Sequence, residues 1–340
     1  MRTVLVTGAS SFLGYHVARR LNERGIRPRV LELAGNDLEA LDRLDVDRVA
    51  GTVGDAAAVR AACTGVDTVL HLAFKVSVGG GADLLNEMRR VNIEGTRQLL
   101  QQAAAAGVRR AVVAGSALAV GVNREAVPLN EAASWSAHAF DIPYAQMRRE
   151  AEADALAQST PGFAVVSACP SFTFGPDDPT GAPANTLLGK IATGKQRFTL
   201  DVGFGCLDVR DFADGVLLAA ERGRPGERYL LSGENVTADE LLARAGAIAG
   251  VRPPRFRPPA FLLRALAGAV ELYCGIRNKP APITRGVLQV LGRYAWYDTT
   301  KARTELGWTP RPLDQTLADT IAWLRNPSAR ATPPAAPVRS

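Results

Sequence analysis

Tyr144 and Arg148 are the two residues whose types and spacing point most directly to chemistry. They are four residues apart, so on a helix both side chains would project from the same face. A cation beside a tyrosine favours the phenolate, and this is how a tyrosine becomes a general acid or base near neutral pH. Because a guanidinium does not lose its proton in an ordinary protein environment, Arg148 would act as a fixed positive charge.

A glycine-bearing turn after the first apolar run is the second chemical signal. It joins a predicted strand at residues 3–7 to a predicted helix at residues 12–23. In such a turn the backbone N–H groups and the helix N-terminus point towards a pyrophosphate, although the same turn can also be a tight connection without a ligand. The residues predicted to bind the cofactor here are Gly8, Ser10, Ser11, Phe12, Leu13 and Gly14.

Glu32 indicates which dinucleotide the turn would bind. It lies at the end of the second predicted strand, 24 residues after Gly8, where an acid would bind the hydroxyls of the adenine ribose. A carboxylate would repel a 2′-phosphate, and the neighbouring Leu33 offers no compensating cation. NAD is therefore expected rather than NADP, unless Glu32 is a solvated residue at a strand end.

The elements that must position these residues alternate between strands and helices. Strands are predicted at residues 3–7, 29–33, 48–51, 68–72, 111–114 and 164–167, and helices at 12–23, 56–63, 85–106 and 144–157. This alternation predicts an α/β fold with a Rossmann-type doubly wound parallel sheet covered on both faces. We expect residues 1–175 to form mainly the NAD-binding domain and residues 176–325 a smaller C-terminal substrate-binding lobe, with some return of chain to the sheet. Residues 326–340 are expected to be a disordered tail.

The composition excludes several other classes of protein. The 340 residues are 47% hydrophobic and 22% charged, which is ordinary for a globular protein with a core. Four dispersed cysteines and three histidines predict neither a disulfide framework nor a metal site. The net charge of +6 is spread over many arginines, so no nucleic-acid partner is expected. The apolar run at residues 261–276 is interrupted by Arg264 and Glu271, so we expect a cytoplasmic protein without a membrane partner.

Taken in order, the motifs resemble those of the extended short-chain dehydrogenases/reductases. Within that superfamily the chain is similar to the NAD-dependent epimerase/dehydratase family, in its dihydroflavonol-reductase-like and hopanoid-associated sugar-epimerase-like branch. The resemblance covers about residues 1–325. The motifs that carry it are residues 7–14, VDTVLHLA at 66–73, VNIEGT at 91–96, Ser116, Tyr144 with Arg148, PSFTFGP at 170–176, DVRD at 208–211 and KARTELGW at 301–308.

The resemblance implies a role for each matching residue. Ser116 would hydrogen-bond the substrate oxygen, and Tyr144 would pass a proton to or from it while a hydride moves to or from the nicotinamide. Arg148 would stand where a lysine binds the nicotinamide ribose. Lys75 would lie near the phosphates, and Asn92 would hold the neighbouring strand through hydrogen bonds. The other cofactor-binding residues that the resemblance implies are Thr52, Val53, Leu72, Ala73, Ala114, Pro170 and Ser171.

Four residues depart from the family's pattern. Ser11 replaces a glycine, and its Cβ would crowd the turn although its hydroxyl could donate to a phosphate. Thr52 and Cys169 stand where aspartate and arginine are common, and with Ser11 they are expected to change affinity more than chemistry. Arg148 replaces the lysine and leaves three interpretations open. It could be a working substitute, a mark of a non-redox elimination, aldol cleavage or cyclisation, or a mark of nucleotide binding without turnover.

The predicted function is an NAD(H)-dependent oxidoreductase that acts on a ketone or secondary alcohol of a hydrophobic or aromatic small molecule. The alternatives are a nucleotide-sugar epimerase or dehydratase that retains NAD, and a non-redox lyase or cyclase. The resemblance also implies a homodimer that pairs the helices at residues 85–106 and 144–157. The preference for a hydrophobic substrate rests on aromatic residues expected near the cleft, namely Phe172, Phe174, Phe198, Phe204, Trp296 and Tyr297.

Overall fold

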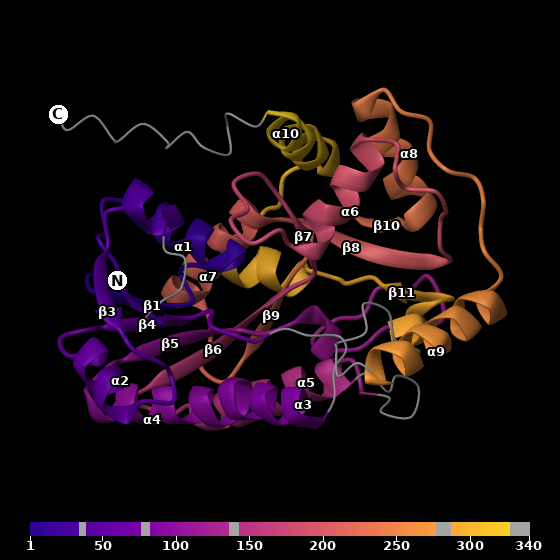
Figure 1. Cartoon of the computed structure of the whole chain (residues 1–340). Helices are drawn as coiled ribbons and strands as arrows, with labels where there is room; N and C mark the ends of the chain where they lie inside the picture. Colours follow the sequence, from indigo (N-terminus) through magenta and orange to yellow (C-terminus); the bar gives the residue numbers. More distant parts are fainter. Residues whose placement is uncertain (34–38, 76–81, 136–142, 277–286, 327–340) are drawn as a thin grey trace.

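The main sheet has seven strands, and every pair of neighbours is parallel. The structure is a computed structural model that describes residues 1–33, 39–75, 82–135, 143–276 and 287–326. The strand order is β3-β2-β1-β4-β5-β6-β9, so the predicted doubly wound parallel sheet is confirmed (Figure 1). The strands are β1 (Val4–Thr7), β2 (Arg29–Glu32), β3 (Asp47–Ala50), β4 (Thr68–His71), β5 (Arg110–Ala114), β6 (Ala164–Pro170) and β9 (Arg228–Leu231).

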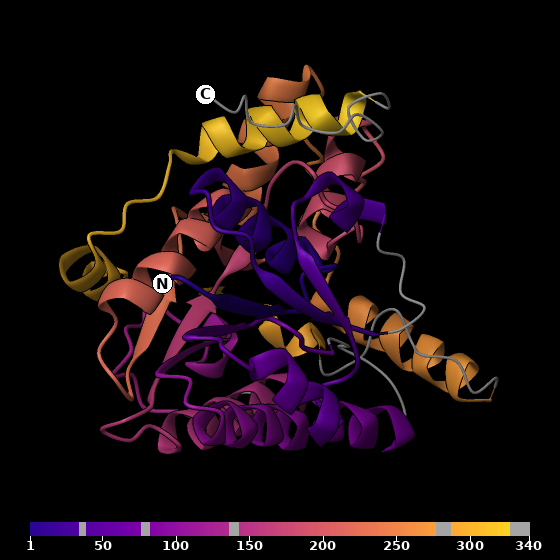
Figure 2. The same ribbon diagram turned by 90° about the vertical axis from the view of Figure 1, so that its left-hand side faces the viewer.

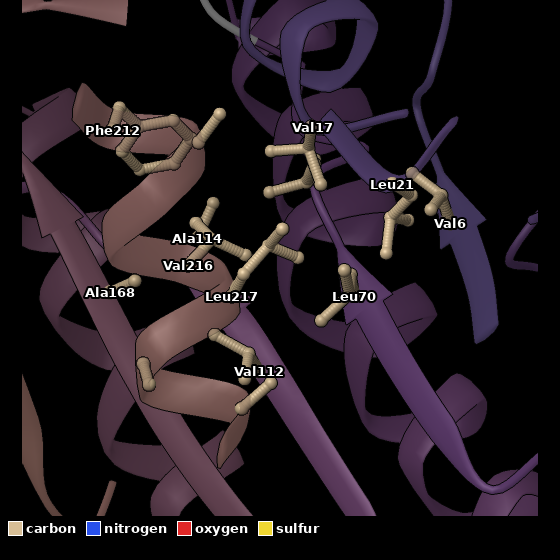
Figure 3. Close-up of a cluster of buried hydrophobic side chains, with 14 of the residues drawn as sticks. Val6, Val17, Leu21, Leu70, Val112, Ala114, Ala168, Phe212, Val216 and Leu217 are labelled. Carbon is tan, nitrogen blue, oxygen red and sulfur yellow. The ribbon is translucent and has the colours of Figure 1, made fainter. Parts of the chain in front are cut away.

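Helices cover both faces of this sheet, as expected for strands that are apolar on both sides. One face carries α1 (Phe12–Glu23) and α7 (Val209–Arg222), and the other carries α2 (Ala56–Cys63), α4 (Thr96–Ala105) and α5 (Pro143–Ala157). In Figure 3 the side chains of Leu21 and Leu217 point from α1 and α7 towards Leu70 of β4. All three are fully buried, so removal of their apolar surface from water stabilises this layer.

The predicted helix at residues 85–106 is interrupted in the structure. It consists of α3 (Ala82–Arg89), a π-helical turn η2 (Arg90–Gly95) and α4. The turn contains Asn92, whose side chain bonds the backbone of the segment after β4, and Gly95, where a Cβ would lie 2.7 Å from Val53 Cγ2. A π-helical turn is common where a helix adapts to such local demands.

A second sheet is built around β8 (Val202–Asp208). Its order is β10-β8-β11, and β7 also pairs with β8. Three helices share one apolar core beside it, namely α6 (Pro183–Ala192), α8 (Ala238–Ala249) and α10 (Leu313–Arg325). A capping box of Thr237 and Glu240 opens α8. The remaining elements are β7 (Phe172–Phe174), β10 (Asn235–Thr237), β11 (Arg293–Ala295), α9 (Ala260–Ile276), η1 (Glu39–Arg43), η3 (Ala117–Ala119), η5 (Val287–Val290) and η6 (Ala302–Leu306).

The two sheets do not divide the chain cleanly at residue 175. Both α7 and β9 follow that residue, yet they pack on α1 and pair with β6 in the first layer. Within the described part of the chain, no helix is both long enough and apolar enough to cross a bilayer. The predicted disordered tail lies outside the described residues except for Asn326.

Candidate active site

The glycine turn between β1 and α1 has the shape of a cradle. Gly8 has a φ of +73°, and a Cβ there would lie 2.7 Å from Ala73 Cα. A Cβ on Gly14 would lie 2.0 Å from the carbonyl oxygen of Gly8. The turn lies at the carboxyl end of β1, next to β4. The strand order reverses between these two strands, and doubly wound sheets bind ligands at such a position. The backbone can therefore approach a pyrophosphate closely, with Leu72 and Ala73 beside it.

Ser11 fits this turn by bonding within it. Its Oγ accepts a hydrogen bond from Gly14 N–H at 3.1 Å and donates one to the Gly8 carbonyl at 2.7 Å. Ser11 is thus the N-cap of α1. In the structure its hydrogen is directed to Gly8, so donation to a phosphate would require that bond to break.

Glu32 is fixed beside the turn. Its carboxylate accepts hydrogen bonds from Ser10 N–H at 3.0 Å and from Ser10 Oγ at 2.7 Å, and the residue is only 6% exposed. The alternative interpretation of a solvated strand-end glutamate is therefore wrong. Each carboxylate oxygen keeps a further lone pair, so Glu32 can still accept from ribose hydroxyls.

Thr52 and Val53 follow β3 at the same edge of the sheet. Thr52 is exposed, and its Oγ1 accepts from Gly54 N–H at 3.1 Å. Val53 is buried against Gly95 of η2. A cavity of about 550 Å³ adjoins the turn at Ser10 and is not lined by Tyr144.

The turn and Glu32 form the phosphate end of the predicted cofactor groove, and Tyr144 and Ser116 lie where its nicotinamide end is expected. Tyr144 is half-buried near the start of α5 and packs against the apolar cluster of Met88 and Ile93 and against that of Val122. Ser116 follows β5, is 8% exposed and makes no capping bond to η3 with its side chain. Because α5 packs against η3, the fold brings the two predicted catalytic residues to one edge of the sheet.

Arg148 lies one turn further along α5 and is buried, with 5% of its surface exposed. Its Nη2 donates to the carbonyl oxygen of Ala114 at 2.5 Å and also to that of Gly115. Its Cζ lies 3.7 Å from the centroid of the Phe74 ring, so the planar guanidinium stacks on the face of this ring.

Two N–H groups of Arg148 remain available. Nε and Nη1 are buried and have no hydrogen-bond partner among the described residues. A buried donor without a partner costs about 1–3 kcal/mol, so these atoms mark a place where an acceptor belongs. The hydroxyls of a ribose are acceptors of that kind. The cradle, Glu32 and Arg148 thus fit the pyrophosphate and the two sugars of NAD.

Asn92 hydrogen-bonds the backbone of the segment that follows β4. Its Oδ1 accepts from the backbone N–H of Lys75 at 2.8 Å, and its Nδ2 donates to the carbonyl of the same residue at 2.8 Å. The Lys75 ammonium pairs with Glu87 of α3 at 2.5 Å and holds the pKa of that carboxyl below its usual value. A role for the Lys75 side chain near the phosphates stays a prediction.

His71 connects the two ends of the groove and was not predicted to do so. Its ring bonds Thr7 Oγ1 at 2.7 Å and Thr96 Oγ1 at 2.8 Å, and its centroid lies 4.9 Å from that of Phe74. Burial, and to a smaller extent the charge of Arg148, lowers the pKa of His71 to about 3. The ring is therefore neutral and ties β1 and β4 to α4.

Glu152 is a second buried residue that the sequence reasoning missed. It accepts hydrogen bonds from Ser167 Oγ and from Cys169 Sγ at 2.9 Å, and it pairs with Arg228 of β9 at 2.9 Å. The guanidinium of Arg228 thus balances the charge of this buried carboxylate. Burial and the neighbouring Glu152 raise the pKa of the Cys169 thiol. The spacing could have identified it, because Tyr144, Arg148 and Glu152 recur every four residues on one helix face.

The remaining predicted residues divide between the site and the cores. Pro170 ends β6, and the buried Oγ of Ser171 has no hydrogen-bond partner among the described residues. Phe174 is fully buried and Tyr297 is 3% exposed, so both belong to cores rather than to the cleft. The half-buried Phe172 and Phe204 stack with their centroids 5.1 Å apart.

Comparisons with known proteins agree with this geometry. The family model described as the NAD dependent epimerase/dehydratase family matches residues 4–232. The chain is 32% identical to sterol demethylase protein B of Methylococcus capsulatus, over 95% of this chain and 98% of that protein. It is 29% identical to a 3-beta-hydroxysteroid dehydrogenase of Mycolicibacterium neoaurum, over 94% of this chain and 90% of that protein. The solved structure of gox2253 is similar with a TM-score of 0.83, at 30% identity over 96% of this chain and 98% of that one.

Proposed function

Because the chain belongs to the NAD-dependent epimerase/dehydratase family and NAD is its cofactor, we propose that it oxidises or reduces a hydrophobic or aromatic small molecule. The reacting group is a ketone or a secondary alcohol. The observation that carries the proposal is the pair of buried, unpartnered N–H groups of Arg148, one helical turn from Tyr144. They would hold a ribose where the phenol can meet the substrate.

The substrate class draws support from the names of two relatives. One is named for a sterol and one for a 3-beta-hydroxysteroid, which is a secondary alcohol on an apolar ring system. Phe172 and Phe204 stack against the core of the second sheet but stay half-buried, so part of their aromatic surface is free near Ser171. Apolar walls with few polar groups are typical of sites for such molecules.

In the proposed mechanism Tyr144 carries the proton. When the carbonyl is reduced, the phenol gives its proton to the substrate oxygen, and in the opposite direction the phenolate takes that proton back. The Ser116 hydroxyl donates a hydrogen bond to the same oxygen and orients it. NAD, when bound, supplies or accepts the hydride. Arg148 binds the nicotinamide ribose through Nε and Nη1, and its fixed charge favours the phenolate.

The other cofactor-binding residues hold the remaining parts of the dinucleotide. The turn at residues 8–14 would hold the pyrophosphate with backbone N–H groups other than those of Ser10, Ser11 and Gly14, which already bond within the protein. The N-terminus of α1 would add its positive end. Glu32 accepts from the adenine ribose, and its buried negative charge disfavours a 2′-phosphate. A homodimer through α3, α4 and α5 is also proposed. Figure 1 shows these helices together on the outer side of the sheet.

The state of the cofactor tests the proposal. Nucleotide released from the purified protein is identified, NADH and NADPH are titrated, and 3-hydroxysteroids, aromatic ketones and nucleotide sugars are then assayed. We expect reversible NADH binding and formation of NADH in a one-to-one ratio with oxidised hydroxysteroid. Tightly held NAD with isomerised sugar would instead establish an epimerase. Binding of neither nucleotide would favour a non-redox lyase or cyclase, and preference for NADPH would contradict the role given to Glu32.

A further inference from the structure

The helix α9 has apolar residues on two faces. Leu263, Ala267, Val270 and Cys274 follow a helical spacing and are partly or fully buried. A second row faces away from the protein, with Leu262 52% exposed, Leu266 58% and Tyr273 57%. Phe261 at the start of the helix is 68% exposed. Figure 2 shows α9 extending away from the two sheets.

Such a row requires an explanation, because an apolar face of a helix is normally buried. Contiguous exposed apolar surface in a folded protein marks a contact with a partner or with a membrane. The other exposed large apolar residues among those described, apart from Phe256, are dispersed over separate elements, namely Leu33, Val127 and Ile248. The feature is therefore specific to α9 and the segment that leads into it.

Charge identifies the kind of partner. Residues 252–276 contain four arginines and one acid, so this short segment carries a formal charge of +3 within the total of +6. Arg252, Arg255 and Phe256 are exposed in the segment before α9, and Phe256 is 63% exposed. Arg257 differs because it already pairs with Asp239 at 2.5 Å. An apolar row beside unbalanced positive charge is the pattern of a helix that lies on an anionic membrane surface.

We propose that residues 252–276 form a docking surface for a bilayer with anionic head groups. Leu262, Leu266 and Phe261 insert at the level of the head groups, and Arg252 and Arg255 bind phosphates. A second copy of the chain fits less well, because two such positive segments would repel each other. The helix is too short to cross the bilayer and lies along it. The proposal replaces the expectation of no membrane partner and goes beyond the proposed reaction.

Sedimentation with vesicles tests the docking surface. The full-length protein is mixed with vesicles of equal parts phosphatidylglycerol and phosphatidylcholine, or of phosphatidylcholine alone, at low and high salt. We expect binding to the anionic vesicles at low salt, and at least about tenfold weaker binding in the Leu262→Gln/Leu266→Gln variant because two apolar side chains no longer insert. Arg255→Gln should weaken binding only to the anionic vesicles. The matched control is Val127→Gln, which changes an apolar residue that is 51% exposed elsewhere.

Folding, oligomerisation and activity are separated from docking in the same experiment. Thermal unfolding and NADH titration of each variant show whether it remains folded. Light scattering shows whether the α9 variant changes the oligomeric state, and an oligomer that breaks up in this variant would overturn the proposal in favour of a second copy. Equal binding by the wild type and the α9 variant would also overturn it. Vesicle binding needs no substrate, so the docking proposal can fail while the oxidoreductase proposal stands. Likewise, the oxidoreductase proposal can fail while vesicle binding is observed.

Discussion

The two ends of the predicted cofactor groove differ in how their polar atoms are satisfied. At the phosphate end, Ser11 bonds Gly8 and Gly14, and both oxygens of Glu32 accept from Ser10. At the nicotinamide end, two N–H groups of Arg148 and the Oγ of Ser171 are buried without a hydrogen-bond partner in the described structure. Buried polar groups are normally paired, so the second end has hydrogen-bonding capacity that a ligand would complete.

This difference suggests that one end determines how tightly the cofactor binds and that the other determines the rate of the reaction. The phosphate end is held in its binding geometry by its own hydrogen bonds, and pre-organisation of this kind lowers the cost of binding. Changes there should alter the affinity for the cofactor. The nicotinamide end contains the groups that would move protons, so changes there should alter turnover.

The largest effect is expected for Tyr144→Phe. Loss of the phenolic hydroxyl removes the proton carrier, so kcat should fall about 10²- to 10⁴-fold while the dissociation constant of NADH stays the same. Steady-state kinetics and fluorescence titration measure the two quantities. The control is Tyr273→Phe, at an exposed tyrosine of α9. Retention of turnover in the Tyr144 variant would show that another group carries the proton.

The next largest effect is expected for Arg148→Ala. The carbonyls of Ala114 and Gly115 lose their donor and the ribose loses its partner, so kcat/KM should fall about 100-fold. Arg148→Lys should retain turnover and shift the alkaline limb of the pH profile, because an ammonium can lose its proton where a guanidinium cannot.

Phe74→Leu provides the matched comparison for the guanidinium. It keeps apolar volume but removes the ring face under Arg148, so it should weaken catalysis by less than Arg148→Ala.

If Arg148→Lys is as inactive as Arg148→Ala, the planar guanidinium has a geometric role that a lysine cannot take over.

A smaller effect is expected for Gly8→Ala at the phosphate end. The new Cβ would clash with Ala73, and the φ of +73° is unfavourable for alanine. The affinity for NADH should therefore fall about tenfold, while kcat at saturating NADH stays the same. Gly25→Ala isolates the backbone strain, because Gly25 has a φ of +72° with nothing within 4 Å. Titration of both variants should show weaker NADH binding in the first alone, and equal affinities would remove the close contact as the cause.

The last prediction concerns stability rather than turnover, and it involves His71, which connects the two ends. Its pKa of about 3 in the folded protein lies below the ordinary 6.5, so the unfolded chain binds the proton first. The free energy of unfolding should therefore fall by about 1.4 kcal/mol per pH unit from this group as the pH drops below 6.5 towards 3. Urea unfolding at several pH values should show a shallower dependence in His71→Asn than in the wild type. Identical slopes would mean that folding does not lower the pKa of His71.

Local signals in the sequence were sufficient for the elements and for one end of the groove. The bounds of α1 and α2 agree with prediction, because apolar spacing and the nearby caps Ser11 and Asp55 fix them within a few residues. The place of Glu32 beside the turn follows from parallel strands that end at one edge of a sheet.

Contacts between distant segments could not be predicted in this way. Arg148 rests on Phe74 and on carbonyls from β5, and Glu152 pairs with an arginine more than seventy residues away. The same holds for the surface, where the sequence gives charges and apolar residues but not their exposure. The physical reason is that helix and strand patterns depend on neighbours along the chain. Partners of buried polar groups and the exposure of α9 depend on how separate elements pack.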